Sequence, residues 1–64
     1  MYFNDEQVNL MNLFRRDNKK KLEEDLNKAL NETNNGYIQY LINKTLYDLN
    51  DITEEEFKDI NFDI

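Results

Sequence analysis

Apolar residues recur along this chain at the three- and four-residue spacing that gathers them on one face of an α-helix. The most regular stripe lies within residues 37–49 and contains Ile38, Leu41, Ile42, Thr45, Leu46 and Leu49. Shorter stripes fall within residues 5–14 and 18–32, and a fourth helix over 54–60 is indicated by the residues at its start. The pattern therefore predicts four helices joined by short polar connections.

The start of the fourth helix is the most strongly specified. Thr53 suits the N-cap position, and Glu56 stands three residues later, where the two residues can form a capping box. Ile52 and Phe57 occupy the positions of a hydrophobic staple across this cap. We therefore expect a helix to begin immediately after Thr53.

The first helix has the same kind of start. Asn4 and Gln7 are spaced for a capping box, and Phe3 and Val8 for a staple. Within this helix, Leu13 is expected to widen the apolar face that packs into the core.

The connection between the second and third helices is predicted to be a turn over residues 33–36. Its sequence is Thr33-Asn34-Asn35-Gly36, and Asn and Gly tolerate a positive φ. Short connections favour antiparallel neighbours. We therefore predict an all-α fold, a compact bundle of three to four short helices that forms one domain over residues 1–64.

Composition leaves little material for catalysis or metal binding. The chain has no Cys and no His, which excludes a zinc site built on thiolate or imidazole. Carboxylates are plentiful, but those at 23–25 and 54–56 are adjacent, and adjacent helix residues diverge by about 100°. We therefore predict a protein that is not an enzyme, with no catalytic residue, no metal and no cofactor.

Hydropathy gives an expectation about location. The longest apolar runs are two or three residues, too short to span a bilayer. The first residues lack the basic start and apolar run of a signal peptide. We therefore expect a cytoplasmic protein without membrane contact.

Charge is distributed unevenly along the chain. The net charge is −6, yet residues 15–21 carry five bases and one acid. This segment is a candidate anion contact through Arg15, Arg16, Lys19, Lys20 and Lys21. Nucleic acid is a possible but less favoured partner, because domains that bind it are usually basic overall. The favoured explanation of the segment is a solvated loop whose charges balance the acidic remainder. The acidic remainder leaves open a third hypothesis, an acidic DNA-mimic or inhibitor protein.

The tyrosines suggest a protein-binding surface. Tyr residues are enriched in binding surfaces because they are amphipathic and lose little rotamer entropy. The predicted third helix carries three of them beside its aliphatic stripe, with a lysine on the same side: Tyr37, Tyr40, Lys44 and Tyr47. An apolar tail at Phe62 and Ile64 could extend this patch, which would hold a protein partner or a second copy in a homo-oligomer. The alternative is that the tyrosines only flank the core with their hydroxyls in water.

Taken together, the apolar and capping positions resemble those of the transposon-transfer assisting protein family. The resemblance begins with Phe3, Glu6 and the run Asn9-Leu10-Met11-Asn12-Leu13-Phe14. It continues through Lys21-Leu22, Asp25-Leu26, Ala29-Leu30, Thr45-Leu46 and Leu49, and closes with Ile52-Thr53-Glu54-Glu55-Glu56-Phe57 and Phe62.

The resemblance implies an accessory protein of a conjugative transposon in Gram-positive bacteria. It implies a partner in the transfer machinery and a role in transfer or its regulation. The matching positions are mainly those assigned to the core and the caps, so the resemblance carries over no functional residue.

Overall fold

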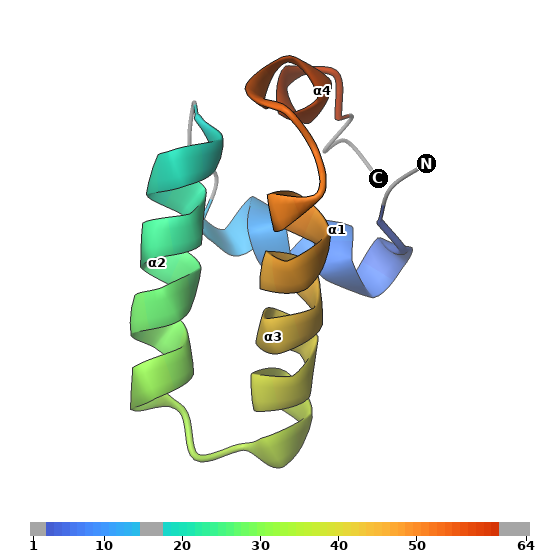
Figure 1. The fold of residues 1–64 in the computed structure, drawn as a ribbon. Helices are drawn as coiled ribbons and strands as arrows, with labels where there is room; N and C mark the ends of the chain where they lie inside the picture. Colours follow the sequence, from blue (N-terminus) through green and yellow to red (C-terminus); the bar gives the residue numbers. More distant parts are fainter. Residues whose placement is uncertain (1–2, 15–17, 61–64) are drawn as a thin grey trace.

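Four helices make up the regular structure of the described residues, 3–14 and 18–60, in this computed structural model (Figure 1). They are α1 (Asp5–Phe14), α2 (Lys19–Glu32), α3 (Gly36–Asn50) and α4 (Glu54–Lys58). No strand occurs within these residues, and the predicted all-α fold is confirmed.

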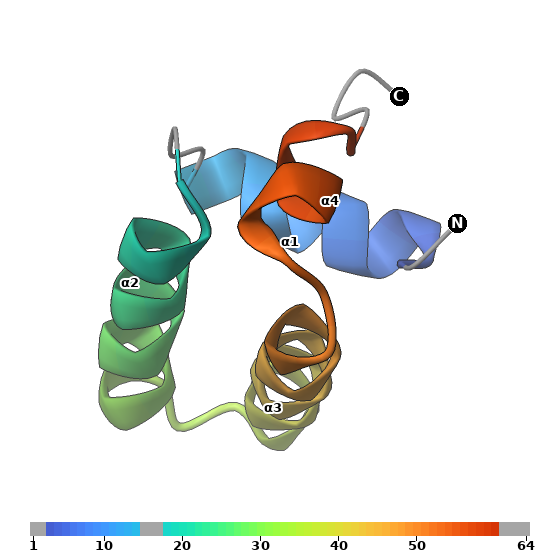
Figure 2. The same cartoon turned by 45° about the horizontal axis from the view of Figure 1, so that its top comes forward.

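Helices α2 and α3 form an antiparallel hairpin that gives the domain its long axis of 32 Å (Figure 1). Helix α1 crosses one face of this hairpin, and α4 lies over the end where α2 begins and α3 ends (Figure 2). Each helix therefore covers part of a common interior, and α1 packs against both α2 and α3.

The core is built from the positions that the helical spacing selects. Its members come from all four helices and from the residues that precede α1 and α4: Phe3, Val8, Leu10, Met11, Leu22, Leu26, Leu41, Ile42, Leu49, Ile52 and Phe57. Ala29, Leu30 and Leu46 pack against this cluster while remaining partly exposed. Burial of one stripe from each helix stabilises helices that are too short to be stable alone.

Both predicted capping boxes are confirmed. Thr53 N–H donates to Glu56 Oε1 at 2.9 Å, and Glu56 N–H donates to Thr53 Oγ1 at 3.1 Å. Asn4 N–H donates to Gln7 Oε1 and Gln7 N–H donates to Asn4 Oδ1, both at 2.9 Å. The staple residues are all buried: Phe3, Val8, Ile52 and Phe57.

The connection before α3 differs from the prediction. No described residue has a positive φ, and Gly36 is the first residue of α3. Asn35 is the N-cap, and its Oδ1 accepts a hydrogen bond from Ile38 N–H at 3.0 Å. The chain reverses through extended backbone at Thr33 and Asn35. Thr33 Oγ1 accepts a hydrogen bond from Asn35 N–H at 3.2 Å, so the side chains of Thr33 and Asn35 both bind backbone N–H groups of this connection and of the start of α3.

Helix α4 is shorter than predicted. It ends at Lys58, and the N–H groups of Asp59 and Ile60 donate to carbonyls three residues back, each at 3.1 Å. The last turn has tightened in the way that is common at helix ends. Residues 59 and 60 therefore continue the turn without continuing the α-helix.

Candidate partner-binding surface

The outward side of α3 carries three exposed tyrosines. Tyr37, Tyr40 and Tyr47 are 53%, 61% and 73% exposed, while Thr45 and Leu49 on the inward side are fully buried. The tyrosines follow at three and seven residues, which keeps them on one side of the helix. Together with Lys44 they form what we call the tyrosine face.

Lys44 on this face is held by a polar connection between helices. Its Nζ lies 3.6 Å from Asp48 Oδ2, and the same oxygen accepts a hydrogen bond from Gln7 Nε2 at 2.8 Å. Gln7 is 1% exposed, so α1 inserts a buried amide against α3. Sequence analysis assigned Gln7 to the cap alone; its second role depends on how α1 and α3 cross.

Tyr37 also borders a groove between α1 and α3. This open groove has a volume of about 660 Å³, and the described residues that line it are Glu6, Asn9, Leu10, Asn12, Leu13, Tyr37, Ile38 and Leu41. We refer to it as the α1–α3 groove. It is a feature that sequence reasoning missed, because its two walls come from helices separated along the chain.

Leu13 in this groove corrects the sequence analysis. It was expected to pack into the core, but its side chain is 81% exposed. Met11, two residues earlier, is fully buried, and two residues turn an α-helix by about 200°. Leu13 therefore lies on the side of α1 away from Met11.

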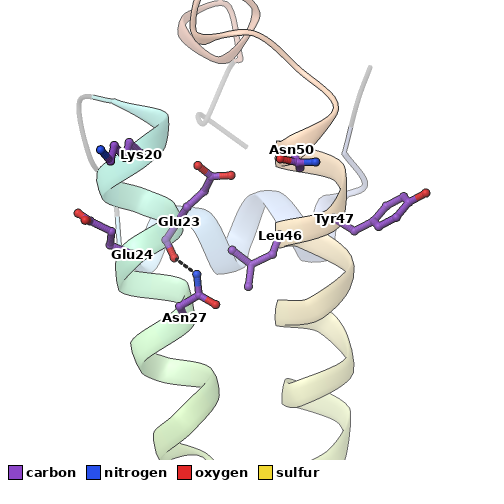
Figure 3. Close-up of a pocket in the computed structure, with 7 residues that line it drawn as sticks. All are labelled: Lys20, Glu23, Glu24, Asn27, Leu46, Tyr47 and Asn50. Atoms are coloured by element: carbon purple, nitrogen blue, oxygen red, sulfur yellow. Dashed lines mark hydrogen bonds between the residues drawn. The ribbon is translucent and has the colours of Figure 1, made fainter.

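Tyr47 belongs to a different hollow, between α2 and α3. This hollow of about 460 Å³ has a lining of mixed charge: Lys20, Glu23, Glu24, Asn27, Leu46, Tyr47 and Asn50. Figure 3 shows Leu46 directed toward α2 and the ring of Tyr47 directed away from it. The structure therefore places Tyr37 and Tyr47 on one helix face but at separate hollows.

The lysines of the basic segment lie in the first turn of α2, where two carboxylates engage Lys19. Glu54 Oε1 of α4 accepts a hydrogen bond from Lys19 N–H at 3.0 Å. Lys19 Nζ lies 3.7 Å from Glu23 Oε2, whereas Lys20 and Lys21 are exposed. A carboxylate therefore occupies a backbone position at which a phosphate could bind.

Some predicted residues lie outside the described part of the chain. Arg15 and Arg16 of the basic segment belong to this group, as do Phe62 and Ile64 of the apolar tail. The candidate surface that the structure describes therefore rests on α1, α2 and α3.

Metal binding and membrane crossing find no structural support in the described residues. Within 3–14 and 18–60, no group of three or more acidic side chains is arranged to hold a metal ion. None of the helices in these ranges has the length and apolar character needed to cross a membrane.

Comparison of the chain with known proteins identifies its family. No curated protein and no solved structure is significantly similar to this chain. A family model matches residues 3–63, a range that includes all four helices, both capping boxes and the tyrosine face. The chain belongs to the family described as putative transposon-transfer assisting protein.

Proposed function

We propose that this protein is a non-enzymatic accessory factor that assists transfer of a conjugative transposon, or its regulation, by contacting a protein of the transfer machinery in the cytoplasm. Membership of the family supports the accessory role in transfer. The observation that carries the protein contact is the tyrosine face, where Tyr37, Tyr40 and Tyr47 are all more than half exposed.

The tyrosine face suits protein binding because its side chains are not part of the buried core. The buried cluster is complete without these three side chains. Exposed Tyr side chains offer large apolar area and a hydroxyl to a partner, with only two torsions to immobilise. Lys44 adds a cation whose position is restricted by Asp48.

Contact with nucleic acid is the less supported alternative. Glu54 and Glu23 already engage the backbone and side chain of Lys19, and the chain as a whole carries a charge of −6. Binding through Lys20 and Lys21 would be lost steeply with added salt. Saturable, salt-dependent binding of transfer-origin DNA, abolished by Lys20→Ala/Lys21→Ala, would favour this alternative.

Transfer frequency tests the proposal directly. The gene is deleted from its element and restored as the wild type, as Tyr40→Ala/Tyr47→Ala, or as the control Lys28→Ala/Glu32→Ala, two exposed residues of α2 that lie outside both hollows. We expect transfer to fall on deletion, to return with wild type and control, and to stay low with the tyrosine variant. Full transfer by a folded tyrosine variant at the wild-type protein level would contradict the proposal.

A further inference from the structure

The α1–α3 groove combines a buried apolar floor with exposed apolar walls. Leu10 and Leu41 at its floor are 7% exposed, whereas Leu13 and Tyr37 on its two sides are 81% and 53% exposed. Two helices that border an apolar floor offer the kind of surface on which an amphipathic helix packs.

The two helices that form the walls of the groove are acidic. Glu6 is the one charged residue among the described residues that line it. Helix α1 also carries Asp5 and has no basic residue, while the single lysine of α3, Lys44, is paired with Asp48. The two walls therefore have a net charge of −2, and the whole chain adds to the same sign with −6.

We infer that the α1–α3 groove binds an amphipathic helix of a partner protein, with aliphatic side chains on one face and Lys or Arg along its flanks. The aliphatic face covers Leu13 and Tyr37, and the basic flanks lie beside Glu6 and Asp5. This inference rests on the proposed function and deepens it, because it names the chemical class of the partner segment.

Charge favours such a partner over a second copy of the chain. Two copies would each bring a charge of −6, which opposes association at low salt. A basic helix instead gains from the same field, chiefly through faster association. Binding should therefore weaken as salt screens the groove.

A designed peptide pair tests this inference without knowledge of the natural partner. The probe is a helical peptide of about 14 residues, long enough for anchors at i, i+3 and i+7, with Leu on one face and Lys on the other. Its control has Glu in place of Lys. Binding to the full chain is followed by amide chemical shifts, which identify the surface, and by titration, which gives the affinity.

The expected result is saturable binding of the Lys peptide with shifts centred on the groove. Leu13→Ala/Tyr37→Ala should weaken it about tenfold or more, as for central interface residues, whereas the charge-neutral control Lys28→Ala/Glu32→Ala, at exposed positions of α2, should change it less than about twofold. Raising salt from about 0.05 M to about 0.5 M should weaken it further. The Glu peptide should bind more weakly than the Lys peptide.

Several results would overturn the inference. These are no binding of the Lys peptide, shifts centred on another surface, equal binding of both peptides, or equal losses in the two double variants. Dimerisation through the groove, seen by sedimentation and abolished by Leu13→Ala, would also overturn it. If Tyr40→Ala/Tyr47→Ala loses transfer but the wild-type chain does not bind the Lys peptide, the groove inference alone is refuted. If the wild-type chain binds the Lys peptide in the groove but Tyr40→Ala/Tyr47→Ala transfers normally, the proposed function is refuted.

Discussion

The two sides of α3 carry different kinds of residue within a single helix. The inward side presents Ile42, Thr45 and Leu49, all fully buried against neighbouring helices. The outward side presents Tyr40 and Tyr47, both largely exposed. Both sides are rich in large side chains, so hydrophobicity alone does not distinguish them.

The difference separates residues that stabilise the fold from residues that are available to a partner. A buried side chain gains from leaving water and from close packing, so its loss should be felt in stability. An exposed tyrosine is neither removed from water nor closely packed, so its truncation should change stability little. Substitutions on the two sides of α3 should therefore differ in their effect on the free energy of unfolding.

The largest expected effect is at Leu49. Leu49→Ala removes a fully buried side chain and should cost about 3 kcal/mol, a large part of the stability of so small a domain. The matched control is Leu13→Ala, which truncates an exposed leucine and should change stability by less than about 0.5 kcal/mol. Urea denaturation measures the free energy of unfolding of both variants. Similar losses of stability in the two would contradict the distinction between buried and exposed apolar residues.

A substitution at Gln7 tests whether the hydrogen bond from α1 to Asp48 of α3 contributes to the stability of the domain. Gln7→Ala removes the bond to Asp48 and one half of the capping box at Asn4, and should cost about 2 kcal/mol. The control is Gln39→Ala, whose amide donates only to Thr33 O within one connection and should cost about 0.5–1 kcal/mol. A smaller loss at Gln7 than at Gln39 would contradict this role.

Thr45 is the one buried polar residue of α3. Its replacement by an apolar residue should raise stability, in contrast to the losses expected at Leu49 and Gln7. Its Oγ1 is buried, and among residues 3–14 and 18–60 it has no hydrogen-bond partner. Thr45→Val should therefore stabilise the domain by about 1 kcal/mol, because a methyl group replaces an unsatisfied hydroxyl. The same change at Thr53, whose hydroxyl caps α4, should cost about 1 kcal/mol, and thermal unfolding of the two variants shows whether the signs differ.

Gly36 tests whether the exposed start of α3 tolerates added atoms. A Cβ at this position meets nothing within 4 Å, and its φ is not positive. Gly36→Ala should raise stability by about 0.5 kcal/mol, because it restricts the unfolded chain without strain in the helix. A loss of stability in thermal unfolding would show that this glycine has a conformational role.

Local features of the fold could be predicted from sequence because their causes lie within a few residues. The capping boxes at Asn4 and Thr53 and the stripe of α3 depend on neighbours in the chain, and the structure confirms them. The predicted turn over residues 33–36 was wrong in detail, because Asn35 caps α3 and no described residue there has the positive φ that was expected. Side-chain capping and a left-handed residue are alternative ways to end and restart a helix, and composition does not choose between them.

Features that depend on how helices cross could not be predicted from sequence. Gln7 and Asp48 are 41 residues apart, and Lys19 and Glu54 are 35 apart, so neither hydrogen bond has a local signal. The same holds for the α1–α3 groove, where Leu13 was expected in the core. The tyrosines could be placed on one helix face from their spacing, but their division between two hollows required the packing of α1 and α2.

The most direct test of the difference between the two sides is the free energy of unfolding of Tyr37→Ala/Tyr40→Ala/Tyr47→Ala. All three side chains are more than half exposed, and Ala has the higher helix propensity, so the net change should stay within about 1 kcal/mol. A change of this size, beside a loss of about 3 kcal/mol in Leu49→Ala, would leave the tyrosine face free for a partner. A loss as large as that of Leu49→Ala would show that the tyrosines stabilise the fold and would contradict the account.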